Sequence, residues 1–153
     1  MVLQTKLFGE VDIDEQKALH FENGLIGFPD LKTFFLIRDE ERASSLICWL
    51  QSVEENAMAL PVLDPLKVME SYNPMVDDEV LKPLGELTED NLMALVTVTV
   101  PRNIENISVN LQAPILINAD TKQACQLILE DGNYPVRYPI YEVLNDMKEK
   151  DGE

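Results

Sequence analysis

The sequence predicts a mainly β fold: one small β-barrel-like domain of short antiparallel strands, with one or two short helices. Three observations lead to this prediction. Apolar and polar residues alternate with a period of two over many short stretches, as in half-buried strands. Turn-forming Pro, Gly, Asn and Asp residues separate these stretches at short intervals. The chain has 153 residues, 46% of them hydrophobic, which suits one globular domain.

The first half of the chain is expected to consist almost entirely of strands. A polar turn at residues 39–45 (DEERASS) separates two of them. Pro61 has no N–H group to donate, so the strand that contains it is expected at a sheet edge or a bulge. The strands of this half are expected near residues 6–13, 19–22, 33–39, 46–53 and 58–64.

The second half is expected to contain one short helix followed by further strands. Asp77, Asp78 and Glu79 open the helix, because negative charges in the first turn favour a helix N-terminus. Gly85 follows as a C-terminal stop. Strands are expected at residues 91–100, 107–118 (as one strand or a broken pair) and 124–130.

We expect residues 1–143 to form a single domain. Residues 144–153 (LNDMKEKDGE) are charged and have little apolar surface to bury, so they are expected to be a frayed helix or disordered. The apolar runs are too short to cross a membrane, and the N-terminus has no apolar block of signal-peptide length. These features predict a cytoplasmic protein.

The stretch NLQAPILIN, residues 110–118, has two interpretations. Its apolar side chains share one strand parity and are expected to fill the barrel interior: Leu111, Ala113, Ile115 and Ile117. Pro114 suggests a sheet edge or a bulge. An exposed edge with amides would accept a partner segment by strand addition. We favour the other interpretation, in which the stretch is core and its amides, including Asn118, are satisfied within the fold.

The charge of the chain restricts its partners. There are 28 acidic and 12 basic residues, which gives a formal net charge of −16. Such a surface repels nucleic acid and anionic membranes and favours a basic partner with fast, salt-sensitive association. The alternative is that the acidity only keeps the protein in solution.

Residues suited to catalysis or metal binding are sparse. Cys48 and Cys125 lie far apart in apolar contexts and are expected to be buried, reduced thiols. His20 is the single histidine, so the ligands of a zinc site are missing. The sequence has no GxSxG, GxGxxG or GxxxxGK[ST] motif. Phe28 and Trp49 are expected in the core. We therefore predict a protein without cofactor or metal that binds other proteins and is not an enzyme.

Two other functions stay open at this point. Acidic clusters recur along the chain, so a hydrolase or lyase using paired carboxylates would show a concave pocket lined by perturbed acids. A generic scaffold protein would show no charge-dependent partner.

Five segments occur in an order and spacing that resemble one protein family. They are LIGFPDLKTFFLI (25–37), WLQSVEENAMALPVLDP (49–65), DDEVLKPLG (77–85), NISVNLQAPILIN (106–118) and LILEDGNYPVRYPI (127–140). Together they resemble the FliW family of flagellar assembly factors, from about residue 3 to about residue 141.

The resemblance implies a small cytosolic protein without catalytic activity. FliW-like proteins bind CsrA, a dimeric RNA-binding protein that represses flagellin translation, and they bind flagellin, which competes for them. An acidic body docked beside the RNA-binding surface of CsrA would lower its affinity for RNA by charge repulsion. We expect the protein alone to be a monomer, with no direct contact to nucleic acid or membrane.

The expected partner-binding residues are exposed polar residues in or beside the family-like segments. They are Glu54, Glu55, Asn56, Arg102, Asn103, Glu105, Asn110, Gln112, Asp77, Asp78 and Glu79. Helix capping is an adequate structural explanation for the last three.

Overall fold

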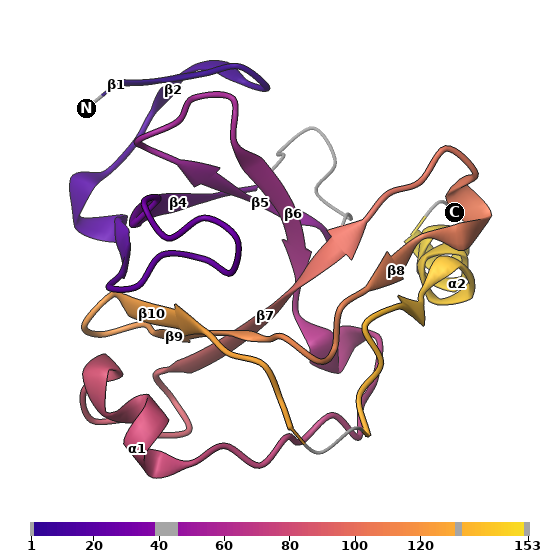
Figure 1. Ribbon diagram of the computed structural model, residues 1–153. Helices are drawn as coiled ribbons and strands as arrows, with labels where there is room; N and C mark the ends of the chain where they lie inside the picture. The colour runs from indigo at the N-terminus through magenta and orange to yellow at the C-terminus, as the bar shows by residue number, and fades with distance from the viewer. Residues whose placement is uncertain (1, 39–45, 131–132, 152–153) are drawn as a thin grey trace.

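The structure is a computed structural model that describes residues 2–38, 46–130 and 133–151. A closed β-barrel forms the body of the molecule (Figure 1). Its strands pair in the order β7–β6–β5–β4–β3–β10–β9, and β9 pairs back onto β7 to close the ring. Strands β8 and β11 extend from β7, and β1 pairs with β2 in a separate hairpin. The mainly β, barrel-like fold predicted from the sequence is confirmed.

The strands are short, as the spacing of turn residues predicts. Their bounds are β1 Val2–Thr5, β2 Gly9–Asp12, β3 Leu19–Phe21, β4 Thr33–Arg38, β5 Cys48–Ser52, β6 Ala59–Leu63, β7 Leu92–Thr99, β8 Ser108–Val109, β9 Ile115–Asn118, β10 Gln123–Gln126 and β11 Tyr138–Pro139. The helices are α1 Asp78–Leu81 and α2 Tyr141–Asp151, with 3₁₀ turns η1 Glu15–Lys17, η3 Pro65–Lys67, η4 Lys82–Leu84 and η5 Ile104–Asn106. Within the described ranges, no helix is long and apolar enough to cross a lipid bilayer.

The barrel interior holds the main hydrophobic core. Alternate residues of its strands point inward, so Phe34, Leu50 and Ile115 are fully buried together. The ring of Phe21 meets that of Phe34 edge-on, with centroids 5.3 Å apart. Closure of the sheet leaves the barrel strands few free edges, which limits pairing with other chains.

A second core lies where β7 and β8 leave the barrel. Buried Val98, Val109 and Ile140 belong to it, and Tyr141 and Leu144 of α2 pack against it. The boundary expected at residues 143 and 144 therefore falls inside α2, which runs on to Asp151. Helix and barrel share this contact surface, and Figure 1 shows α2 beside β8.

The N-terminal segment differs from the single strand expected at residues 6–13. It forms the β1–β2 hairpin, in which Val2 pairs with Asp12 and Thr5 with Gly9. The Thr5 hydroxyl accepts the Phe8 N–H and donates to the Gly9 carbonyl, each at 2.9 Å, which closes the turn. The sequence prediction missed this turn because a hydroxyl, rather than Pro or Asn, initiates it.

The stretch expected at residues 107–118 is a broken pair of strands, β8 and β9. The interpretation of residues 110–118 as an exposed sheet edge is wrong. Strand β9 starts only at Ile115, and it lies between β7 and β10, so it has no free edge. All four of its residues are buried, and residues 111–113 form bends instead of strand. The core interpretation is the correct one for β9, and the amide of Asn118 is satisfied within the fold.

The edge position expected for Pro61 is found, whereas one strand pair is parallel instead of antiparallel. Pro61 lies opposite Trp49 of β5, and β6 pairs with β7 only from Val62 onward, so Pro61 does occupy a local edge. Strand β10 pairs with β3 in parallel, against the antiparallel expectation. No short hairpin joins these distant strands, so nothing in their connection imposes an antiparallel direction. The turn predicted at residues 39–45 lies outside the described residues.

Candidate protein-binding surface

The segment formed by α1 and η4 begins and ends where the sequence predicts a helix, although only its first part is α-helical. The Asp77 carboxylate accepts the Glu79 N–H at 3.1 Å, which satisfies one free donor of the first turn. The chain continues into η4 and leaves it at Gly85, whose φ of +87° favours glycine. Glu79 forms an ion pair with Lys82 at 3.1 Å between two exposed side chains. Asp77, Asp78 and Glu79 are all exposed, and of these Asp77 caps the helix and Glu79 pairs with Lys82.

Two buried amides hold the loop after η4 against the barrel. The Asn118 amide, fully buried, donates to the carbonyls of Leu84 (2.8 Å) and Glu86 (3.1 Å). Its oxygen accepts the N–H groups of Asp120 and Thr121. Asn91 adds a second clamp, since its amide donates to the Glu86 carbonyl and the Asp120 carboxylate.

These clamps gather carboxylates at one end of the barrel, which we call the acidic end. Figure 1 shows α1 lying below β9 and β10, beside the start of β7. The Asn91 contacts bring the loop that follows η4 to the turn between β9 and β10. The acidic end comprises the exposed residues Asp77, Asp78, Glu79, Glu86, Glu89, Asp90 and Asp120.

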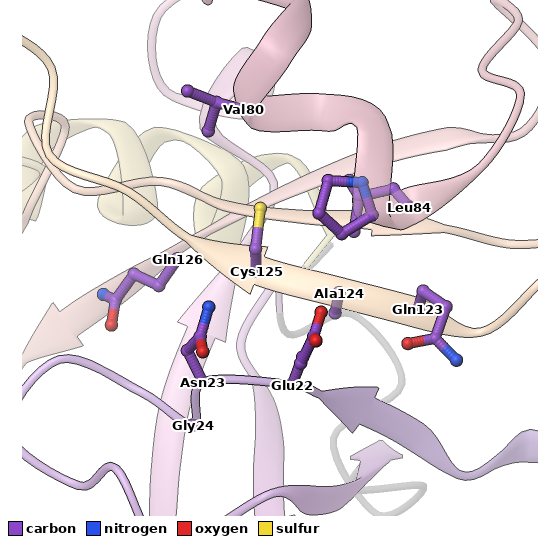
Figure 2. Close-up of a pocket in the computed structure, with 10 residues that line it drawn as sticks. Glu22, Asn23, Gly24, Val80, Leu84, Gln123, Ala124, Cys125 and Gln126 are labelled. Carbon is purple, nitrogen blue, oxygen red and sulfur yellow. The ribbon is translucent and has the colours of Figure 1, made fainter.

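A small pocket of about 140 Å³ opens beside the acidic end. Val80 and Leu84 lie on one side of it, and β10 and the loop after β3 lie on the other (Figure 2). The Cys125 sulfur points toward the α1–η4 segment. Burial raises the pKa of the Cys125 thiol, which disfavours the reactive thiolate. Both cysteines are free, with Cys48 buried as expected and Cys125 half-buried.

The predicted residues at the β5–β6 turn are exposed but structurally engaged. The Glu54 carboxylate accepts the N–H groups of Lys32 (3.2 Å) and Thr33 (3.1 Å), which ties this turn to the start of β4. Glu55 accepts the Ala57 N–H at 3.2 Å. The Asn56 carbonyl accepts the Lys6 N–H at 3.0 Å, so this turn also anchors the β1–β2 hairpin.

The predicted residues between β7 and β9 fall in two places. Arg102, Asn103 and Glu105 are exposed around η5, where the Asn103 side chain caps the turn by accepting the Glu105 N–H at 3.2 Å. Asn110 and Gln112 are half-buried. The Asn110 oxygen accepts the Gln112 N–H at 3.0 Å, which bends the chain before β9.

The structure therefore does not gather the predicted residues into one patch. Figure 1 places the β5–β6 turn at the top of the view, α1 at the bottom and η5 beside α2 at the right. Only Asp77, Asp78 and Glu79 lie within the acidic end. Glu86, Glu89, Asp90 and Asp120 are not among the predicted residues, because Asn91 and Asn118 bring their segments together only in the folded chain.

Neither cavity described in the structure pairs two carboxylates. Glu22 is the single acid of the small pocket, and Asp64 is the single acid of a larger groove between β7 and η3. The Asp64 carboxylate already accepts the Leu66 N–H at 2.9 Å. Within the described residues, no group of three or more His, Cys, Asp or Glu side chains is placed to hold a metal ion.

Two aromatic residues assigned to the core have different environments. Trp49 is half-buried and packs edge-on against Phe8, with ring centroids 6.0 Å apart. Phe28 is 44% exposed, so its assignment to the core was wrong. Its backbone forms an isolated bridge to Leu25, which is buried.

Comparison with known proteins assigns the family. The FliW protein family model matches residues 2–140. The chain belongs to the FliW family. A flagellar assembly factor FliW of Lachnoclostridium phytofermentans is 43% identical over 155 residues, which cover 100% of this chain and 99% of that protein. The FliW of Lachnospira eligens is 44% identical over 94% of this chain and 97% of its own length.

A crystal structure of a flagellar assembly factor FliW has the same fold. It superposes with a TM-score of 0.84 at 30% sequence identity, over 92% of this chain and 96% of that one. The resemblance inferred from five sequence segments is therefore confirmed over nearly the whole chain.

Proposed function

We propose that this protein is a cytosolic flagellar assembly factor that binds the translational regulator CsrA and is itself bound by flagellin. The observation that carries the proposal is the match to the FliW family over residues 2–140, at up to 44% identity to proteins named as flagellar assembly factors. In this function it relieves the CsrA-dependent repression of flagellin translation, as a monomer and without catalysis.

The distribution of charge supports this function. The net charge is −16, and every carboxylate whose burial is described is exposed except Asp64, which is half-buried. The charge thus faces solvent, where it acts on an approaching partner over about 10 Å at moderate salt. CsrA holds RNA and must present cations, so the two surfaces attract each other.

The mechanism follows from where the negative charge is placed. When the acidic end lies beside the RNA-binding surface of CsrA, it repels the RNA phosphates without occupying their site. CsrA then binds RNA tightly when it is free and weakly when this protein is bound to it. By linkage, RNA weakens the binding of this protein to CsrA by the same factor.

Flagellin sets the level of the free antagonist. When flagellin is abundant it occupies this protein, and CsrA represses the flagellin message. When flagellin is exported, the protein is released and removes CsrA from that message. The concentrations and affinities of both partners together set the outcome, because each partner binds the same pool of protein.

Calorimetry with CsrA and flagellin from the same organism tests the proposal. We expect CsrA binding at about 50 mM salt that weakens at about 300 mM and is lost after saturation with flagellin. Binding that does not change with salt would keep the partner but reject the electrostatic mechanism. No binding to either protein would reject the function.

Matched charge variants locate the interaction. The triple variant Asp78→Asn, Glu89→Gln, Asp90→Asn removes three charges from the acidic end, and we expect it to weaken CsrA binding and flatten its salt dependence. The control variant Glu15→Gln, Asp30→Asn, Glu70→Gln removes the same charge from exposed residues elsewhere. Equal loss in both variants would show that net charge acts without a defined surface.

A further inference from the structure

Strand β6 leaves the barrel wall at a definite point. It pairs with β7 through Val62–Thr97 and Leu63–Val96. In the same register the next residues, Asp64 and Pro65, would face Leu95 and Ala94. Instead Asp64 caps the 3₁₀ turn η3, and Pro65 has no N–H group for a ladder.

The departure of β6 leaves part of β7 paired on one side only. Leu92, Met93 and Ala94 pair with β9, and within the described residues no strand pairs with them on the opposite side. Backbone groups of a strand point alternately to its two sides. The Leu92 N–H already donates to the Thr88 carbonyl at 3.2 Å. The other backbone groups of this segment that point away from β9 are available to a further strand, and we call the segment the open edge of β7.

A groove of about 480 Å³ runs along this open edge. Its lining is mainly apolar and includes Leu36, Leu63 and Leu95. Leu66, Leu92 and Met93, also in the lining, are 51%, 41% and 39% exposed, so this apolar surface faces solvent. An open strand edge beside an apolar groove is the arrangement that accepts an extended peptide.

The groove is also cationic within an acidic protein. Arg38 and Lys67 line it and are exposed, and neither forms an ion pair with any residue that the structure describes. The one acid of the lining, Asp64, is held by the Leu66 N–H. With only 12 basic residues against 28 acidic ones, two cations beside an apolar groove favour an acidic ligand there.

We propose that the groove binds an extended segment of a partner protein that alternates apolar and acidic residues, by adding it as a strand to the open edge of β7. The apolar side chains of the segment fill the groove, and its carboxylates face Arg38 and Lys67. This site is separate from the acidic end, which attracts basic surfaces, so it does not depend on the CsrA proposal.

Nuclear magnetic resonance with synthetic peptides tests the proposal on the intact ¹⁵N-labelled protein. The probe is an acetylated peptide of alternating Val and Glu, about eight residues long. We expect it to shift the amide signals of Leu92–Leu95 and slow hydrogen exchange there. The matched peptide of alternating Val and Lys should bind at least several-fold more weakly. Equal binding of both peptides, or perturbation of another face only, would overturn the proposal.

Matched variants test the two cations. Arg38→Gln with Lys67→Gln is expected to weaken binding of the Val–Glu peptide about 3–10-fold. The control, Lys17→Gln with Lys32→Gln, removes the same charge from exposed positions outside the groove, and we expect unchanged affinity. Equal losses in both variants would overturn the cation assignment.

Two further readouts separate strand addition from other occupants. Signal shifts at Leu92–Leu95 without slowed exchange would mean that the peptide lies on the groove and does not pair with the edge, which overturns strand addition. Concentration-dependent shifts of the same signals without peptide would assign the groove to a second copy of this chain. Failure of CsrA or flagellin binding leaves all of these outcomes unchanged, so the two proposals fail separately.

Discussion

The acidic end and the groove lie on opposite sides of the same stretch of β7, and they differ in how its backbone is completed. At the acidic end, β9 pairs with β7, and the amides of Asn91 and Asn118 satisfy the carbonyls of the adjoining loop. At the groove, Pro65 and the Asp64 cap turn the chain away from β7. The first side is closed and acidic, and the second is open and mainly apolar, with Arg38 and Lys67 in its lining. Buried amide contacts therefore build the first surface, whereas a proline and a capped turn that end the β6–β7 pairing create the second.

The largest expected loss of stability is at Asn118, whose buried amide holds the loop on the closed side of β7. Asn118→Ala removes a buried amide that bonds two carbonyls and two N–H groups. We expect a loss of about 3 kcal/mol of unfolding free energy, measured by urea denaturation. The control Asn103→Ala, at an exposed cap, should cost about 1 kcal/mol or less. Equal losses would mean that Asn118 is no more than a cap.

The next effect is at Gly24, in the wall of the small pocket. Its φ is +66°, and a Cβ there would lie 2.4 Å from the Phe28 carbonyl oxygen. Gly24→Ala is expected to destabilise the protein by about 2 kcal/mol more than Gly27→Ala, since Gly27 has a similar φ but open space around it. Thermal or urea unfolding of the pair measures the difference, and identical stabilities would refute the close approach.

A smaller effect is expected at the cap of α1. Asp77→Ala removes the acceptor for the Glu79 N–H and should cost about 1 kcal/mol. Asp78→Ala lies one residue further on, is also exposed, and should change stability by less than about 0.5 kcal/mol. The same urea titrations decide this. If Asp78 proves the more costly position, the helix start is misplaced.

The smallest effect on stability is expected in the groove. Leu66→Ser replaces a side chain that is 51% exposed, so the unfolding free energy should change by less than about 0.5 kcal/mol. Binding of the Val–Glu peptide, followed by fluorescence or resonance shifts, should nevertheless weaken several-fold because an apolar wall is lost. A large stability loss with unchanged binding would show that Leu66 is core and reverse the contrast between the two sides.

The thiol beside the acidic end should be slow to react. The raised pKa of Cys125 leaves less thiolate at neutral pH than in the unfolded chain. Alkylation by iodoacetamide in the native Cys48→Ala variant should therefore be slower than in urea, and its rate should rise with pH along a curve displaced to higher pH. Superimposable native and unfolded curves would contradict the effect of burial.

The sequence by itself determined the elements that local chemistry specifies. Strand alternation and turn residues located most strands, and Asp77 with Gly85 located the bounds of the α1–η4 segment, because propensity and capping act over a few residues. The five family-like segments also sufficed to assign the family. The turn between β1 and β2 was not predicted, because a turn held by a threonine hydroxyl has only a weak signal in the sequence.

Only the tertiary structure decided which of these elements meet. It brought Asp120 to Asn91, and it placed β9 between two strands instead of at an edge. The same applies to the groove, which exists because β6 diverges from a β7 strand that lies about 30 residues later in the sequence. Contacts between distant residues depend on barrel closure and register, and neither of these has a local pattern in the sequence.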